Sequence, residues 1–315
     1  MPEDGASLKF LECIMSNRSS NPLVPVEMTF LSGQLQCHAL FFRPLGAGPF
    51  PVIVMAHGLG GTKEMRLSAF AERFVAAGYA CLVFDYRYFG TSEGEPRQLL
   101  DIKCQLEDWK AAVTYARGLP EINRVILWGT SFSGGHVLST AADDQAISAV
   151  ISQCPFTDGL ASSLAISPIT SLKVTALALQ DWIGSWFGAR PVMIPLSGRP
   201  GQTALMTAPD AHSGYRAIQP PGSNIPNYVA ARIALQISRY YPGRRVSRIA
   251  CPILFCVCDT DSVAPAKATL RHADRAQRRE IKHYPDGHFD IYVGEAFERV
   301  IEDQLDFLRR IVPVR

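Results

Sequence analysis

Short, uninterrupted apolar runs alternate along this chain with longer segments in which apolar residues recur every three or four positions. The short runs predict strands that are buried on both faces of a sheet, at residues 51–56, 80–84, 124–128 and 147–151. The longer segments predict helices, at residues 63–77, 99–117 and 132–142. Strands separated by helices predict an α/β fold, with a mostly parallel central sheet and helices on both of its faces.

More strands are expected at both ends of this pattern. Residues 24–30 and 34–43 have strand composition and flank a glycine-containing turn, so they predict an antiparallel hairpin at the sheet edge. Later in the chain, residues 252–257 and 280–284 resume the strand pattern, and residues 295–311 predict a closing helix.

Residues 155–248 interrupt the alternation with a stretch that is rich in proline, glycine and aromatic residues. Helical spacing returns within it at residues 171–187 and 227–240. We therefore expect a core domain, formed by residues 1–154 and 249–315, and an inserted cap that covers the carboxyl-terminal edge of the sheet.

The sharpest chemical signal is Ser131, which directly follows a predicted buried strand and opens a predicted helix. A tight strand-to-helix turn that presents a nucleophilic serine needs small residues two positions before and after it. Gly129 and Ser133 occupy those positions, although glycine is more usual at the second. Ser131 is therefore the expected nucleophile, and the alternative is a glycine-rich helix start with a capping serine.

A carboxylate and an imidazole follow the two late strands. Asp259 and Asp261 come after the strand at 252–257, and His288 comes after the next strand. In nucleophilic catalysis the imidazole takes the serine proton, and the carboxylate orients the imidazole. Position alone does not decide between the two aspartates, because residues two apart in an extended segment can point to the same side.

The loop at residues 57–61, His-Gly-Leu-Gly-Gly, comes directly after the first predicted parallel strand. Its glycines would let a substrate approach the backbone closely. The backbone N–H groups of Leu59 and of Phe132 are the expected donors to a developing oxyanion. His57 itself is expected to be structural, because the reaction needs no second base.

Together these motifs resemble the α/β-hydrolase superfamily. The resemblance extends to residues 84–94, Phe-Asp-Tyr-Arg-Tyr-Phe-Gly-Thr-Ser-Glu-Gly, in which Tyr88 replaces the usual glycine. Serine, aspartate and histidine also follow one another in the order of this fold. The resemblance implies that Asp261, four residues before Pro265, is the acid of the triad.

Within the superfamily the chain is similar to bacterial hydrolases grouped with dienelactone hydrolases and X-prolyl dipeptidyl peptidase-like proteins. Dienelactone hydrolases proper use a cysteine where this chain has Ser131, so that activity is not expected. The resemblance is weakest in the cap, where Trp182 and Trp186 are spaced to share a helical face and are candidate substrate-binding residues.

Composition excludes several other classes of protein. Lys and Arg number 31 and Asp and Glu 29, and no basic run stands out, so a nucleic-acid partner is not expected. No stretch approaches the ~18 apolar residues of a membrane span. The acidic, polar start at residues 1–5 and the eight scattered cysteines, which lack a CxxC pair, favour a cytoplasmic protein with free thiols. The seven histidines do not cluster, so neither a metal nor a cofactor is expected.

These residues predict a serine hydrolase, carboxylesterase-like, that acts on a small-molecule acyl substrate through an acyl-enzyme. A thioesterase or acyltransferase of secondary metabolism would share the same triad and is the main alternative. Peptidase and carbon–carbon hydrolase activity are less favoured, and a non-catalytic binding protein is disfavoured by the intact triad. The sequence leaves the oligomeric state open, a homodimer included.

Overall fold

The computed structural model describes residues 24–314. The expectations for the N-terminal residues 1–5 and for Cys13 therefore lie outside the described residues. Within them, eight strands form one sheet in the order β1-β2-β4-β3-β5-β6-β9-β10. This arrangement confirms the predicted mostly parallel sheet, because only the pairings β1 with β2 and β2 with β4 are antiparallel.

The strands agree closely with the apolar runs of the sequence. The predicted edge hairpin is β1, Val26–Ser32, and β2, Leu35–Phe42, joined through Gly33 at φ 59°. The remaining strands of the sheet are β3, Phe50–Ala56; β4, Ala80–Phe84; β5, Ile122–Thr130; β6, Ala149–Gln153; β9, Ile253–Cys258; and β10, Arg279–Tyr284. The side chains of β3, β4, β6 and β9 are buried throughout, as expected of strands covered on both faces.

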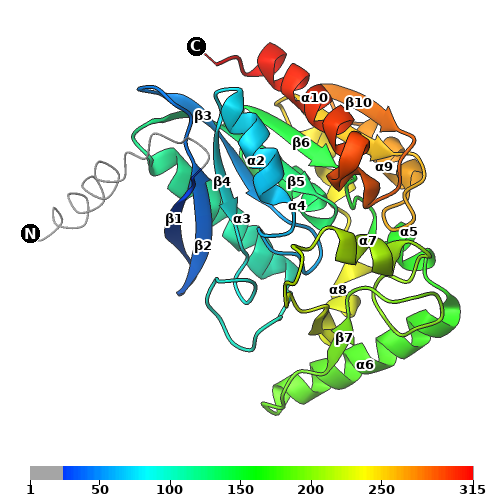
Figure 1. Cartoon of the computed structure of the whole chain (residues 1–315). Coiled ribbons are helices and arrows are strands. Elements are labelled where there is room, and N and C mark those ends of the chain that lie inside the picture. The colour runs from blue at the N-terminus through cyan, green and yellow to red at the C-terminus, as the bar shows by residue number, and fades with distance from the viewer. Residues whose placement is uncertain (1–23, 315) are drawn as a thin grey trace, which may run out of the picture.

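Helices cover both faces of the sheet (Figure 1). On one face α2, Leu67–Ala76, packs beside α10, Gly294–Ile311. On the other, α3, Ile102–Gly118, packs beside α4, Phe132–Asp143, with α9, Ala266–Ala273, next to β9. No helix in the described range is long and apolar enough to cross a membrane.

The helix predicted at 63–77 begins four residues late. Lys63 is drawn out of the helical path, because its backbone N–H and its Nζ both donate to the buried Asp85, at 2.7 and 2.5 Å. Arg66 then takes a left-handed conformation, φ 68°, before α2 begins. A tertiary ion pair therefore overrides the helical spacing of these residues.

The chain between β6 and β9 is mainly helical and irregular. It contains α5, Gly159–Leu164; α6, Pro168–Trp186; β7, Met193–Pro195; α7, Ala211–Ala217; β8, Tyr228–Ala230; η1, Ala231–Ile233; α8, Ala234–Ile237; and η2, Pro242–Arg248. The long α6 confirms the helix predicted at 171–187. The helix predicted at 227–240 is wrong at its start, because β8 pairs with β7 and buries Val229 opposite Ile194.

Two buried histidines give the fold a dependence on pH. Burial lowers the pKa of His136 to about 3 and that of His57 to about 4, against an ordinary 6.5. Neutral His136 is held between the Tyr240 hydroxyl, 2.8 Å from Nδ1, and Gln105 Oε1, 2.9 Å from Nε2. Both rings must therefore stay neutral in the folded protein, whereas they become protonated in the unfolded chain near pH 6.5.

We expect the free energy of unfolding to fall as the pH drops from about 6.5 toward 4, by about 1.4 kcal/mol per pH unit for each of these histidines. The sign follows because the unfolded state binds more protons than the folded state throughout this range. Urea unfolding at pH 7.5, 6.0 and 5.0 measures the effect. In a His136→Gln variant, the free energy of unfolding should fall less steeply with decreasing pH. An unchanged pH dependence in that variant would show that His136 does not contribute to it.

Candidate active site

Ser131 occupies the sharp turn between β5 and α4. Its backbone angles, φ 57° and ψ −121°, lie in a region that residues with a Cβ rarely adopt. The turn needs a glycine at position 129, because a Cβ there would come within 2.3 Å of the Ser133 carbonyl oxygen. The strain is held by the buried strand on one side and the buried helix on the other, so the Ser131 hydroxyl has a fixed direction.

The serine at position 133, where glycine is more usual, fits because its hydroxyl has a buried partner. Ser133 Oγ lies 2.9 Å from the hydroxyl of Tyr86, which also accepts from the indole N–H of Trp109 at 2.9 Å. All three side chains are fully buried or nearly so. The departure from the usual motif therefore costs no unsatisfied polar group.

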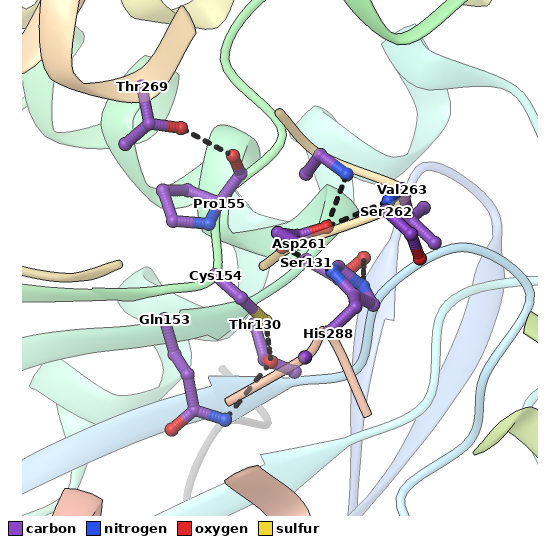
Figure 2. A network of polar contacts seen from close by, with 12 residues as sticks. Thr130, Ser131, Gln153, Cys154, Pro155, Asp261, Ser262, Val263, Thr269 and His288 are labelled. Atoms are coloured by element: carbon purple, nitrogen blue, oxygen red, sulfur yellow. Dashed lines mark hydrogen bonds and ion pairs between the residues drawn. The ribbon is translucent and has the colours of Figure 1, made fainter. Parts of the chain in front are cut away.

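Three side chains from distant parts of the chain meet at the turn (Figure 2). The Oγ of Ser131 lies 2.9 Å from His288 Nε2, and His288 Nδ1 lies 2.7 Å from Asp261 Oδ2. The side chains of His288 and Asp261 are 1% and 2% exposed. Exclusion of water strengthens both hydrogen bonds and holds the imidazole in one orientation.

The two candidate aspartates have different partners. The second carboxylate oxygen of Asp261 accepts from the backbone N–H groups of Val263 and Ala264, at 2.8 and 2.6 Å. Asp259 points elsewhere, with its carboxylate 47% exposed and 2.8 Å from His283 Nδ1. Only Asp261 of the pair reaches His288.

The loop at residues 57–61 lies against the serine. A Cβ added to Gly58 would come within 2.7 Å of the Ser131 Cβ, so only glycine permits this approach. Within the described residues, the backbone N–H groups of Leu59 and Phe132 have no protein acceptor. Both N–H groups are therefore free to donate to a bound group, as an oxyanion site requires.

His57, the first residue of this loop, is buried, and among the described residues no hydrogen bond joins its ring to Ser131. Its ring stacks on Tyr292 at 5.9 Å, and its Nδ1 accepts from the backbone N–H of Gly58 at 2.8 Å. A Cβ on Gly61 would come within 2.2 Å of the same nitrogen. The ring thus shapes the loop, in keeping with its expected structural role.

The segment at residues 84–94 supports the site without entering it. The Asp85 carboxylate accepts from Lys63 and from the Thr91 backbone N–H, which ties this segment to the loop that carries residues 57–61. Tyr88, which replaces the usual glycine, adopts φ 73°, a left-handed conformation that glycine takes without strain.

A cavity of about 320 Å³ opens from Ser131 toward α5, α6 and α8. Its walls are mostly apolar side chains and hydroxyls, and Arg239 is the one charged residue among the described lining. The apolar part of the lining comprises Leu59, Phe132, Phe156, Ala165, Ile166, Val174, Leu205, Met206, Ala208, Ala234, Leu235, Ile237, Val263 and Ala264. Such a lining suits an uncharged acyl chain.

Trp182 and Trp186 do not line this cavity. They contact each other, with ring centroids 4.4 Å apart, and are 42% and 64% exposed on the outside of α6. The sequence indicated correctly that they share a helical face, but it could not indicate that they lie two turns or more beyond the residues of α6 that line the cavity. Ser171, Val174 and Thr175, in the first half of α6, line the cavity instead.

Cys154, Asp261 and His288 bring potential metal ligands within 4.8 Å of one another. Burial raises the pKa of the Cys154 thiol to about 12, so it stays protonated at neutral pH, whereas a metal needs the thiolate. His288 and Asp261 already use the atoms concerned for each other and for Ser131. The donor set therefore fits a proton-transfer site better than a metal site.

Comparison with known proteins places this chain among hydrolases. A family model described as serine aminopeptidase, S33, matches residues 47–293. The chain is 68% identical over 296 residues to quorum-quenching protein AidA of Acinetobacter baumannii (strain MDR-ZJ06), covering 93% of this chain and 97% of that protein. It is 28% identical to thiohydrolase aneE of Aspergillus aculeatus, covering 85% of this chain and 88% of that protein.

Among solved structures, the α/β hydrolase GrgF from Penicillium sp. sh18 superposes with a TM-score of 0.79 at 26% identity. The match covers 92% of this chain and 99% of GrgF. The predicted α/β-hydrolase fold is therefore confirmed.

Proposed function

This chain belongs to the serine aminopeptidase S33 family of hydrolases, and we propose that it cleaves a carboxylic ester through a Ser131–His288–Asp261 triad. The observation that carries the proposal is the continuous pair of hydrogen bonds from the serine hydroxyl through the imidazole to a buried carboxylate. The elbow supports it, because its strained geometry has a purpose only if the hydroxyl must be presented to a substrate.

In the proposed mechanism His288 Nε2 takes the Ser131 proton as Oγ attacks the substrate carbonyl carbon. Asp261 stabilises the imidazolium that forms, and the N–H groups of Leu59 and Phe132 stabilise the negative oxygen. The imidazolium gives its proton to the leaving alcohol, and an acyl-enzyme remains. A water molecule, deprotonated by the same imidazole, then releases the acid.

We propose that residues 155–248 act as a cap that sets acyl-chain length. The cavity next to Ser131 is walled by residues of this segment, including Val174, Met206 and Leu235. An apolar wall stabilises an alkyl chain by about 0.8 kcal/mol for each buried CH₂. The value of kcat/KM should therefore rise with the length of the acyl chain until the chain fills the cavity.

The biological substrate we propose is a bacterial signal that carries an acyl chain. The relative from A. baumannii is named a quorum-quenching protein, and a hydrolase quenches a signal by cleaving one of its bonds. An N-acyl homoserine lactone offers both a ring ester and an amide for cleavage. The ester is the bond that our proposal assigns to this chain.

A thioesterase or acyltransferase is the second candidate, supported by the likeness to a protein named thiohydrolase. An esterase, a thioesterase and an acyltransferase would all form the acyl-enzyme on Ser131 in the same way. The candidates differ in the leaving group of the first step and in the acceptor of the second.

One panel tests these candidates. We expect kcat/KM on p-nitrophenyl esters to rise from the acetate to a medium-chain ester and to exceed kcat/KM on the matching acyl thioester. An added alcohol or amine should not be acylated. Opening of the lactone ring is expected to yield an acyl homoserine. Faster thioester cleavage, or acyl products of the added acceptor, would favour the second candidate.

A substitution in the cavity wall checks the cap assignment in the same panel. Val174→Trp should lower kcat/KM on the medium-chain ester by about 10-fold or more and leave acetate within about 3-fold, because a larger side chain fills the acyl space. Gln180→Ala is the control on the same helix and should leave the profile unchanged, because Gln180 is exposed and does not line the cavity. Equal loss at every chain length in Val174→Trp would contradict an acyl role for the cavity.

A further inference from the structure

The outer face of α6 carries an apolar seam with the spacing of a coiled coil. Its members alternate at intervals of three and four residues and are Ile169, Leu172, Ala176, Leu179, Ile183 and Trp186. All six are exposed, Leu172 by 73% and Ile169 by 70%. A repeat of 3.5 residues is the signature of a helix that packs along its length against another helix.

The opposite face of α6 is anchored, so the seam cannot turn inward. Val174 and Ala178 are buried beneath the helix. The buried Asp181 accepts from the backbone N–H of Arg232 at 2.8 Å and from its guanidinium at 2.7 and 2.9 Å. The seam is therefore a permanent outer surface of the single chain, and Figure 1 shows α6 along the rim of the molecule.

The size of the surface matches what a stable dimer needs. Trp182, 42% exposed, and Phe187, 81% exposed, flank the seam. Together with the five large seam residues they expose roughly 800 Å², about the area that each partner buries in a standard-size protein interface. Single exposed apolar side chains are ordinary, but a continuous patch of this size on one helix marks an interaction site.

The charges on α6 favour a protein partner over a lipid surface. A helix that lies on a membrane is typically rich in lysine and arginine on its polar face. Lys173 is the one exposed charged residue of α6, because the helix's other charged side chain, Asp181, is buried. A second copy of the same helix offers the complementary narrow apolar seam and no opposing run of like charges.

We infer that two copies of this chain form a dimer through their α6 seams, packed antiparallel about a two-fold axis. With a two-fold axis, the same patch of both copies forms the two sides of the interface. If the axis is perpendicular to the two α6 helices, these helices run in opposite directions. The axis passes near Ala176, at the middle of the seam, where the small side chain permits close helix approach. Because Ser171 and Thr175 of α6 also line the cavity, the dimer would stiffen the cavity wall.

Sedimentation velocity tests the dimer on the full chain, at protein concentrations from 1 to 50 µM. The wild type is expected to sediment as a dimer, and Leu179→Glu as a monomer, because it places two charges in the apolar interface. Leu45→Glu is the matched control, since Leu45 is 68% exposed in the loop between β2 and β3 and should leave the dimer intact. Circular dichroism confirms that both variants fold.

A monomeric wild type, or a Leu179→Glu protein that remains dimeric, would overturn the inference. Flotation with vesicles of anionic phospholipid distinguishes membrane binding from dimerisation. If the wild type floats with the vesicles and is monomeric in their absence, the seam binds a membrane surface and the dimer is refuted.

Cross-linking tests the orientation. With a short bis-maleimide, Ala176→Cys should give a covalent dimer, because position 176 lies near the axis. Ile169→Cys should not, because antiparallel packing separates the two copies of position 169 by about 21 Å along the helix axes at a rise of 1.5 Å per residue. The wild type, with its own cysteines, measures the background. Efficient cross-linking at 169 but not at 176 would overturn the antiparallel arrangement.

Discussion

Ser131→Ala is expected to lower kcat for ester hydrolysis by about 10⁴- to 10⁶-fold, as removal of the nucleophile does in other serine hydrolases. Among the residues that the structure describes, no other hydroxyl is hydrogen-bonded to His288, whose Nε2 contacts Ser131 Oγ at 2.9 Å. The change removes one oxygen atom, and the strained backbone remains fixed by β5 and α4. We therefore expect the variant to fold, to bind substrate and to escape labelling by a fluorophosphonate.

Ser133→Ala is the matched control. This neighbouring serine is also buried, but its hydroxyl bonds Tyr86 and not His288. Its loss should destabilise the fold by about 1 kcal/mol, the usual cost of one buried hydrogen bond, and leave kcat within about 10-fold. A folded Ser131→Ala protein with near wild-type kcat would refute the nucleophile assignment, whatever the control shows.

Asp261→Asn is expected to lower kcat by about 10⁴-fold, while Asp259→Asn changes it less than about 10-fold. An amide at position 261 can donate to His288 Nδ1, which favours the tautomer whose proton sits on Nε2. That tautomer cannot accept the Ser131 proton. The replaced oxygen matters less for the fold, because Val263 and Ala264 can still donate to the remaining carbonyl oxygen.

Asp259→Asn acts as an internal comparison of identical chemistry two residues away. The Asp259 carboxylate is 47% exposed and bonds His283 on the outside of the sheet edge, so its neutralisation leaves the imidazole of His288 untouched. Steady-state kinetics on both variants, with circular dichroism to establish folding, measure the difference. The larger loss in a folded Asp259→Asn protein would reverse the assignment.

Local pattern was a good guide wherever the structure depends on neighbours in sequence. The apolar runs predicted β3, β4 and β9 to within a residue or two, because a strand buried on both faces needs continuous apolar side chains whatever its partners are. The turn at Ser131 was predicted for a similar reason. Glycine before the serine and a small residue after it are required by the sterics of the turn itself.

Local pattern failed where a distant residue decides the conformation. Nothing in residues 63–66 reveals that Asp85 will draw Lys63 out of a helix. The strand β8 forms only because β7, about 35 residues earlier in the chain, supplies its partner. Tyr88 likewise adopts a positive φ for which its own side chain has no preference.

By itself, then, the sequence determined the order of strands and helices, the strained turn and the chemical types that could react there. Those properties follow from burial and backbone sterics, which act over a few residues. Position along the chain left open which aspartate faces His288 and which residues of α6 line the cavity, and the tertiary structure decided both. Both depend on the direction of a side chain within a folded frame, and that direction is set by packing and hydrogen bonds between segments far apart in the chain.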